Sequence, residues 1–104
     1  MAKEVGGDFV IFDAASQYEG WAHRAQSTPP LFLVKPYIKE AIIFGGATGG
    51  TVLITDIDSG ETIIPSMEVA ADEEQVYPIN AWVDGIWTET IDSGIKVRFN
   101  LGYY

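Results

Sequence analysis

The sequence predicts an all-β fold, an antiparallel β-sandwich or small barrel of about six to eight short strands with an irregular N-terminal arm. One observation is a repeated turn: Ile-Asp-Ser-Gly occupies residues 57–60 and 91–94, and a β-rich run follows each copy. Glycine supplies positive φ, and an Asp carboxylate accepts from the backbone two residues on, as in hairpin turns. The other observation is the alternation of apolar and polar residues over 95–101, which is typical of a strand with one buried face.

The first third of the chain is the least regular part. Residues 9–12 (FVIF) are compatible with one strand, whereas residues 14–26 have a weak helical pattern that Gly20 interrupts. The pair Pro29-Pro30 can neither continue a helix nor donate to a β-ladder.

This irregularity sets the predicted domain organisation. We predict an arm over residues 1–30 and a β-sandwich domain over residues 31–104, a single domain of ordinary size. The arm is expected to be mobile in the free monomer and to become ordered against a partner. Its removal is expected to leave the β core folded.

The middle of the chain holds the next strand candidates. In residues 37–44, we place Ile38, Ile42 and Phe44 on one face and Lys39 on the other. The remaining candidates here are residues 31–34, 51–57 and 61–64, the last of which Pro65 is expected to stop.

Besides the run at residues 95–101, two further strands are predicted in the last third of the chain. Residues 75–77 end at Pro78 and suit a sheet edge. Residues 82–87 carry two tryptophans and a glycine at which a β-bulge would fit. Because Trp82 and Trp87 are five residues apart, a regular strand would place one in the core and the other at an interface or on a sugar-binding face.

The charge balance excludes several kinds of partner. The chain has 15 acidic and 6 basic residues, for a net charge of −9. Such a chain is unsuited to nucleic acid or to an anionic membrane surface, since both require Lys and Arg. An acidic contact face would instead favour a basic patch on a protein partner. With no cysteine, thiolate chemistry and disulfides are excluded.

No catalytic, cofactor or metal-binding motif is complete. Residues 56–61 begin like a calcium loop but miss the later EF-hand ligands, so we predict a plain turn and no tight calcium site. The glycine-rich stretch 45–50 lacks the Lys and the following helix of a P-loop, and we interpret it as a hairpin connection. His23 is the only histidine and has no second metal ligand nearby in sequence. We therefore expect a protein that is not an enzyme and has no cofactor.

Aromatic residues near the two ends of the chain are the candidate contact residues. Exposed aromatic side chains are enriched at protein interfaces. The predicted partner-binding residues are Phe9, Phe12, Trp21, Pro29, Pro30, Tyr103 and Tyr104.

Residues 37–101 resemble a class of small β-rich virion structural proteins of tailed bacteriophages. The resemblance rests on residues 52–56 (VLITD), a turn and a short strand ending near Ile64, residues 85–87 (GIW) and residues 90–97 (TIDSGIKV). It implies a capsid decoration or cement protein, made in the host cytoplasm and located on the capsid surface of the virion. The implied partners are major capsid protein subunits and further copies of the chain, with no nucleic acid and no membrane.

Two other functions remain open on the sequence. One is a carbohydrate- or host-binding β module that uses Trp82 or Trp87 as a stacking platform. The other is a tail or neck adaptor protein. The copy number per virion separates the decoration protein from the adaptor, and a glycan panel separates the sugar-binding module from both.

Overall fold

The computed structural model describes residues 3–6, 8–18, 37–57, 59–83 and 85–102. The described residues are 67% strand and contain no helix, which confirms the predicted all-β class. Their nine strands are β1 (Lys3–Val5), β2 (Phe9–Phe12), β3 (Gln17–Tyr18), β4 (Tyr37–Phe44), β5 (Gly50–Thr55), β6 (Thr62–Val69), β7 (Glu74–Trp82), β8 (Ile86–Ile91) and β9 (Lys96–Gly102).

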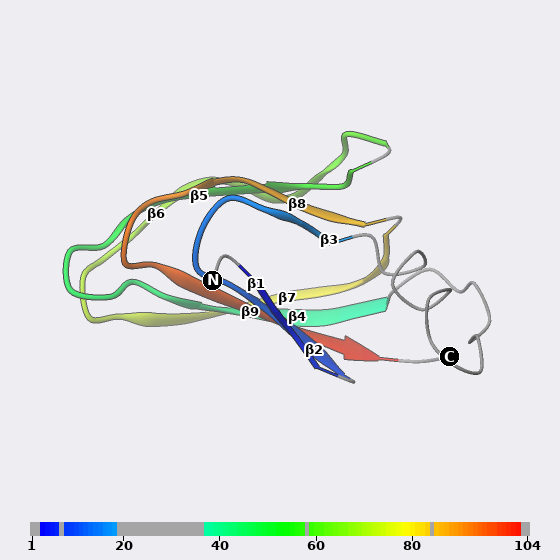
Figure 1. Ribbon diagram of the computed structural model, residues 1–104, viewed down its shortest axis with the longest axis horizontal. Helices are drawn as coiled ribbons and strands as arrows, with labels where there is room; N and C mark the ends of the chain where they lie inside the picture. Colours follow the sequence, from blue (N-terminus) through cyan, green and yellow to red (C-terminus); the bar gives the residue numbers. More distant parts are fainter. Residues whose placement is uncertain (1–2, 7, 19–36, 58, 84, 103–104) are drawn as a thin grey trace.

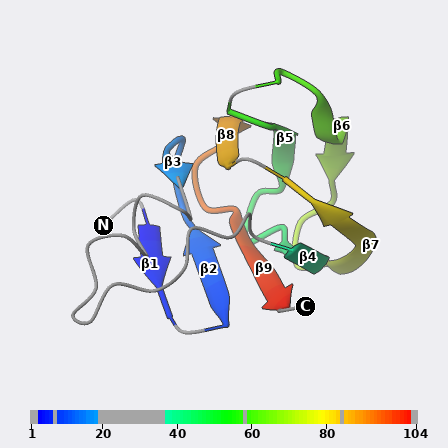
Figure 2. The same cartoon turned by 90° about the vertical axis from the view of Figure 1, so that its right-hand side faces the viewer.

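The strands form two antiparallel sheets that pack face to face as a β-sandwich (Figure 1). Sheet A has the order β1-β2-β9-β4-β7, and sheet B has the order β3-β8-β5-β6. Figure 2 shows the two sheets as separate layers. The two sheets are not closed into a barrel. Of the two predicted architectures, the structure is therefore the β-sandwich.

The strand pairing is that of a jelly roll. The pairs β2·β9, β3·β8, β4·β7 and β5·β6 are nested, as if one long hairpin with its tip at the β5–β6 turn had been folded over. This double-sheet arrangement of eight strands defines the jelly roll, and β1 adds a ninth strand at the edge of sheet A. Consecutive strands therefore usually lie in different sheets.

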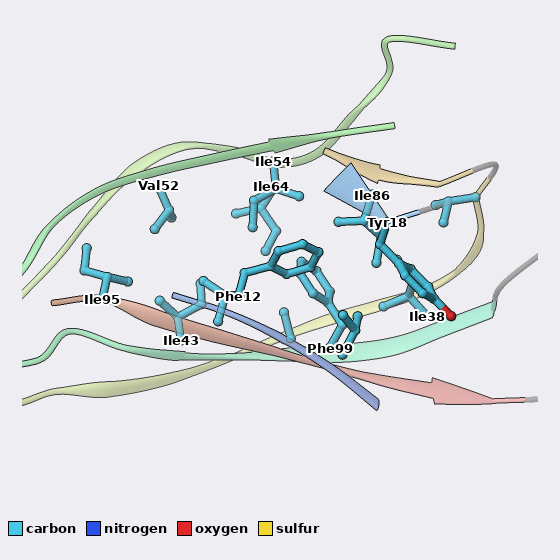
Figure 3. Close-up of a cluster of buried hydrophobic side chains, with 14 of the residues drawn as sticks. Phe12, Tyr18, Ile38, Ile43, Val52, Ile54, Ile64, Ile86, Ile95 and Phe99 are labelled. Carbon is cyan, nitrogen blue, oxygen red and sulfur yellow. The ribbon is translucent and has the colours of Figure 1, made fainter. Parts of the chain in front are cut away.

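The core lies between the sheets and takes side chains from both (Figure 3). Phe12 and Phe99, both fully buried, meet edge to face with ring centroids 5.8 Å apart. Ile95, Val97, Phe99 and Leu101 are all buried, which confirms the alternation predicted for the last strand.

The N-terminal segment belongs to the sandwich, and the prediction of an arm over residues 1–30 is wrong for its described part. Strand β2 pairs with β9 along its whole length, and Val10 and Phe12 are fully buried. Strand β3 pairs with β8 and buries Tyr18. The strand expected over residues 9–12 is present as β2, whereas the two residues of β3 are too few to give a periodic signal. Only the pairing with β8 and β9 shows that both strands belong to the sandwich.

The two Ile-Asp-Ser-Gly turns have different roles. The first joins the paired strands β5 and β6, so the predicted hairpin is correct. The second joins β8 in sheet B to β9 in sheet A, so it is a connection between sheets. The Asp92 carboxylate accepts a hydrogen bond from the backbone N–H of Thr51, at 2.7 Å, and thus binds β5 instead of its own turn.

The glycine-rich stretch 45–50 is likewise an inter-sheet connection and not a hairpin. It runs from β4 to β5 and packs against the β6–β7 connection, where Gly45 N–H donates to Glu73 O at 2.8 Å and Asp72 N–H donates to Gly46 O at 2.7 Å. Figure 1 shows these connections together with the β8–β9 connection at the left end of the sandwich. A Cβ on Gly46 would lie 2.2 Å from Gly94 O, so the close stacking of these connections requires glycine.

Two strands continue through a proline that was expected to end them. Pro65 lies within β6 and Pro78 within β7. Both are edge strands, which tolerate a residue without an N–H because they pair on one side only. The edge position predicted for residues 75–77 is confirmed.

A β-bulge in β4 changes the faces predicted for that strand. The pairing with both neighbours shifts between Ile38 and Glu40. Ile38, Ala41 and Ile43 consequently point into the core, whereas Ile42 and Phe44 lie on the outer face. The prediction that Ile38 shares a face with Ile42 and Phe44 is therefore wrong.

Candidate functional site

The outer face of sheet A carries a row of side chains across four strands. The register places Ile11 of β2 beside Arg98 of β9, Arg98 beside Ile42 of β4, and Ile42 beside Val76 of β7. Their neighbours along β2, β4, β7 and β9 point inward and fill the core, because side chains alternate between the faces of a strand.

Five apolar residues on this face form what we call the outer apolar patch. Val76 is 58% exposed and Phe44 is 39% exposed, and the other three are half-buried. Arg98 of β9 lies between the two members on β2 and the three on β4 and β7. Exposed apolar side chains grouped on one sheet face are typical of an interaction surface. The members of the patch are Phe9, Ile11, Ile42, Phe44 and Val76.

A chain of polar contacts fixes the centre of the same face. The Arg98 guanidinium lies over the Phe9 ring, 4.5 Å from its centroid, and its Nε donates to Asn100 Oδ1 at 2.9 Å. Asn100 Nδ2 in turn donates to Glu40 Oε2 at 3.3 Å. These contacts hold the Arg98 side chain in place before any partner arrives, which lowers the entropy lost on binding.

Among the residues that the structure describes, the basic side chains all belong to sheet A. The described basic residues are Lys3, Lys39, Lys96 and Arg98, and all of them lie in strands of sheet A. The strands of sheet B contain Glu68 and Glu89 but no Lys or Arg. On the outer face of sheet A, Lys96 and Arg98 therefore lie beside the apolar patch together with Glu40 and Glu74.

Trp82 and Trp87 lie in different sheets. Strand β7 ends at Trp82 in sheet A and β8 begins at Ile86 in sheet B, so residues 82–87 are a crossing between sheets and not one strand. Trp82 is 44% exposed and Trp87 is 38% exposed. The expectation that one of them is a core residue is wrong, because the crossing removes the strand geometry on which it depended.

The structure separates the predicted partner-binding residues. Phe9 lies in the outer apolar patch, but Phe12 is fully buried in the core and is not available to a partner. Trp21, Pro29, Pro30, Tyr103 and Tyr104 lie outside the described residues.

Sequence reasoning missed Ile11, Ile42, Phe44 and Val76 as surface residues. For Ile42 and Phe44 the reason is the bulge at Lys39, which reverses the phase of β4. For Ile11, the sequence did hold a signal: Ile11 alternates with Val10 and Phe12, which are core residues, and this alternation indicates the opposite face of the strand.

Metal-ligating side chains are not clustered in the part of the chain that the structure describes. Among residues 3–6, 8–18, 37–57, 59–83 and 85–102, no three His, Asp or Glu side chains are grouped in a way that would hold a metal ion. In the turn at residues 57–60, Ser59 Oγ accepts from Glu61 N–H at 3.2 Å, and Asp58 lies outside the described residues.

No family model, curated protein or solved structure matches the chain. In the part of the chain that the structure covers, there is no helix long and apolar enough to cross a membrane.

Proposed function

We propose that this protein is a non-enzymatic virion structural protein, a decoration or cement protein that binds a capsid through the outer face of sheet A. The observation that carries the proposal is the outer apolar patch, which presents Phe44 and Val76 to solvent beside a fixed Arg98. Exposed aromatic and aliphatic side chains next to an ordered Arg are the usual components of an interface centre.

The fold supports this proposal by analogy only. Jelly rolls occur in viral capsid domains, but also in lectins and cupins, so the fold does not choose among these functions. The proposed contact surface is the outer face of sheet A, where apolar side chains from the three strands β2, β4 and β7 lie on one face of a single sheet.

The proposed mechanism depends on many copies. A standard specific interface buries about 800 Å² on each partner, which is a large share of the surface of an 11.4 kDa domain. We therefore propose that each copy binds major capsid protein subunits and also neighbouring copies of itself. Weak contacts then add across the shell through multivalency.

A particle-binding experiment tests this function. Particles that lack the protein are incubated with increasing amounts of the purified full-length chain and then pelleted. We expect saturable binding at a fixed ratio to the major capsid protein. A few copies per particle would instead assign the protein to the tail or neck, and no binding at all would reject a virion function.

A further inference from the structure

Trp87 lies on the outer face of sheet B, which is the side of the sandwich opposite to the outer apolar patch. Its neighbours Ile86 and Thr88 are fully buried, whereas Trp87 is 38% exposed, as the alternation of side chains along β8 requires. The indole therefore presents a large apolar surface to solvent on a face that the proposed capsid contact does not use.

Gln17 lies directly beside Trp87 on the same face. Strand β3 pairs with β8 in the register Gln17↔Trp87 (Figure 2), and the Cβ atoms of directly opposed residues are about 4.5–5.5 Å apart. Gln17 is exposed, whereas the next residue, Tyr18, is buried in the core. The Gln17 amide, which both donates and accepts hydrogen bonds, is therefore within reach of a ligand that covers the indole.

Hydrogen bonds hold the backbone of β3 in place beside β8. Ser16 N–H donates to Thr88 Oγ1 at 2.8 Å, and Thr88 N–H donates to Ser16 O at 3.0 Å. Lys3 Nζ donates to Gln17 O at 2.6 Å, which engages its ammonium group with the backbone. The position of Gln17 relative to Trp87 is thus fixed before a ligand binds, which reduces the entropy lost on binding.

Glu89 adds a carboxylate further along β8. It is exposed, like Trp87 two residues before it, and the pairing of β8 with β5 skips it, so it is the extra residue of a β-bulge. The strands of sheet B carry Glu68 and Glu89 but no Lys or Arg, which disfavours a ligand that is itself negatively charged. Lys3 already places an ammonium group at the Gln17 carbonyl, which disfavours a cationic ligand beside it. The surroundings of Trp87 therefore favour a neutral ligand.

An exposed indole beside an amide and a carboxylate suits a sugar ring. The C–H face of a pyranose is apolar and stacks on an indole. Its hydroxyl groups donate to carboxylate and amide oxygens and accept from an amide N–H.

We propose that the outer face of sheet B binds a neutral carbohydrate, with Trp87 as the stacking platform and Gln17 and Glu89 as hydrogen-bonding groups. This inference goes beyond capsid binding, since it concerns a second site with a different class of ligand. The two sheets are opposite layers of the sandwich (Figure 1), so a copy that binds the shell through sheet A presents this site away from the shell.

Indole signals in a nitrogen–proton correlation spectrum of the full chain test the proposal, and the Trp87 signal is identified by its loss in Trp87→Phe. The probes are three neutral tetrasaccharides (cellotetraose, mannotetraose and chitotetraose), two anionic ones (tetragalacturonate and a heparin tetrasaccharide) and an oligolysine peptide. We expect at least one neutral sugar at about 10 mM to shift the Trp87 signal in a saturable manner. Absence of such a shift with all three neutral sugars, or an equal shift with the anionic sugars or with oligolysine, overturns the proposal.

Matched tryptophan variants locate the site. Affinity is measured on the sugar protons by saturation-transfer NMR, and circular dichroism checks that each variant is folded. Trp87→Ala should weaken binding of the neutral sugar at least tenfold, whereas Trp82→Ala, which removes a similarly exposed tryptophan from sheet A, should leave it unchanged. If Trp87→Ala fails to fold, Trp87→Phe keeps a smaller ring and should weaken binding by a smaller factor. Unchanged affinity in the folded Trp87 variant, or an equal loss in folded Trp82→Ala, contradicts the assignment.

A further variant tests the amide beside the indole. Gln17→Met keeps the length of the side chain and removes its hydrogen-bonding groups, so it should weaken sugar binding by about threefold or more. The control is Gln75→Met, which makes the same change on β7 of sheet A and should leave the affinity unchanged. Equal affinities of the two variants would contradict a role for Gln17. A chain that binds particles but no neutral sugar would reject only this site, because Gln17 and Trp87 are not members of the outer apolar patch.

Discussion

Thr88 forms hydrogen bonds with the backbone of Ser16, which lies 72 residues earlier in the sequence. Thr88 Oγ1 accepts from Ser16 N–H at 2.8 Å and lies 3.0 Å from Ser16 O, which also accepts from Thr88 N–H at 3.0 Å. Because Thr88 is fully buried, these bonds connect the N-terminal segment to sheet B at a position without solvent. The start of the chain is therefore part of the folded core.

Replacing this hydroxyl tests its contribution to stability. Thr88→Val keeps the shape of the side chain but leaves Ser16 N–H without its acceptor, and we expect a loss of about 1–3 kcal/mol in the free energy of unfolding. Urea titration followed by tryptophan fluorescence measures the loss. Thr90→Val is the control, since Thr90 is only half-buried, and its effect should stay within about 0.5 kcal/mol. Equal effects of the two variants would contradict the account.

Deleting residues 1–30 should unfold the domain, contrary to the expectation from the sequence. The deletion removes β1, β2 and β3, takes Val10, Phe12 and Tyr18 out of the core and leaves β9 without one neighbour. Burial of Val10 and Phe12 alone contributes about 3–6 kcal/mol, a large part of the roughly 5–15 kcal/mol of a typical domain. Far-ultraviolet circular dichroism measures the outcome.

A shorter deletion provides the control for this experiment. Removing residues 1–5 takes away only the edge strand β1, which supplies none of the described core residues, so this variant should remain folded. A native β spectrum from the chain that starts at residue 31 would show that β1–β3 are dispensable.

Glycine substitutions should differ in effect according to their surroundings. Gly60 has φ of 74°, and a Cβ at this position would meet open space. Gly60→Ala should therefore lower the free energy of unfolding only by the roughly 1–2 kcal/mol that the left-handed conformation costs alanine. Gly46 has φ of 68°, and the Cβ introduced by Gly46→Ala would also collide with Gly94 O. We expect this collision to lower the free energy of unfolding by a further amount of about 1–3 kcal/mol. Denaturation midpoints of the two variants measure the difference. Equal midpoints would mean that the inter-sheet connections are not closely stacked.

Local patterns in the sequence predicted those parts of the fold that local physics determines. The alternation over residues 95–101 identified β9 and its buried face, because a half-buried strand requires a period of two. The first Ile-Asp-Ser-Gly turn identified a hairpin. The second copy has the same residues but joins two sheets, and what distinguishes it is the bond from Thr51 N–H to Asp92, a contact between distant residues.

The candidate site was harder to predict, because it depends on irregularities within strands. One bulged residue in β4 separates Ile42 and Phe44, on the outer face, from Ile38, with which they were expected to share a face. Phe9 was identified as a contact residue, but its neighbour Phe12 belongs to the core, and only the pairing of β2 with β9 separates their roles.

Binding of an outer-face variant to particles tests the central claim most directly. Phe44→Thr combined with Val76→Thr removes the two most exposed members of the outer apolar patch and keeps residues that suit a strand. The control, Trp87→Thr, removes a large exposed side chain from the other sheet. In the pelleting experiment we expect the double variant to lose at least tenfold in apparent affinity, or about 1.4 kcal/mol, while the control binds like the unmodified chain. Binding of the folded double variant with unchanged affinity would contradict attachment through the outer face of sheet A.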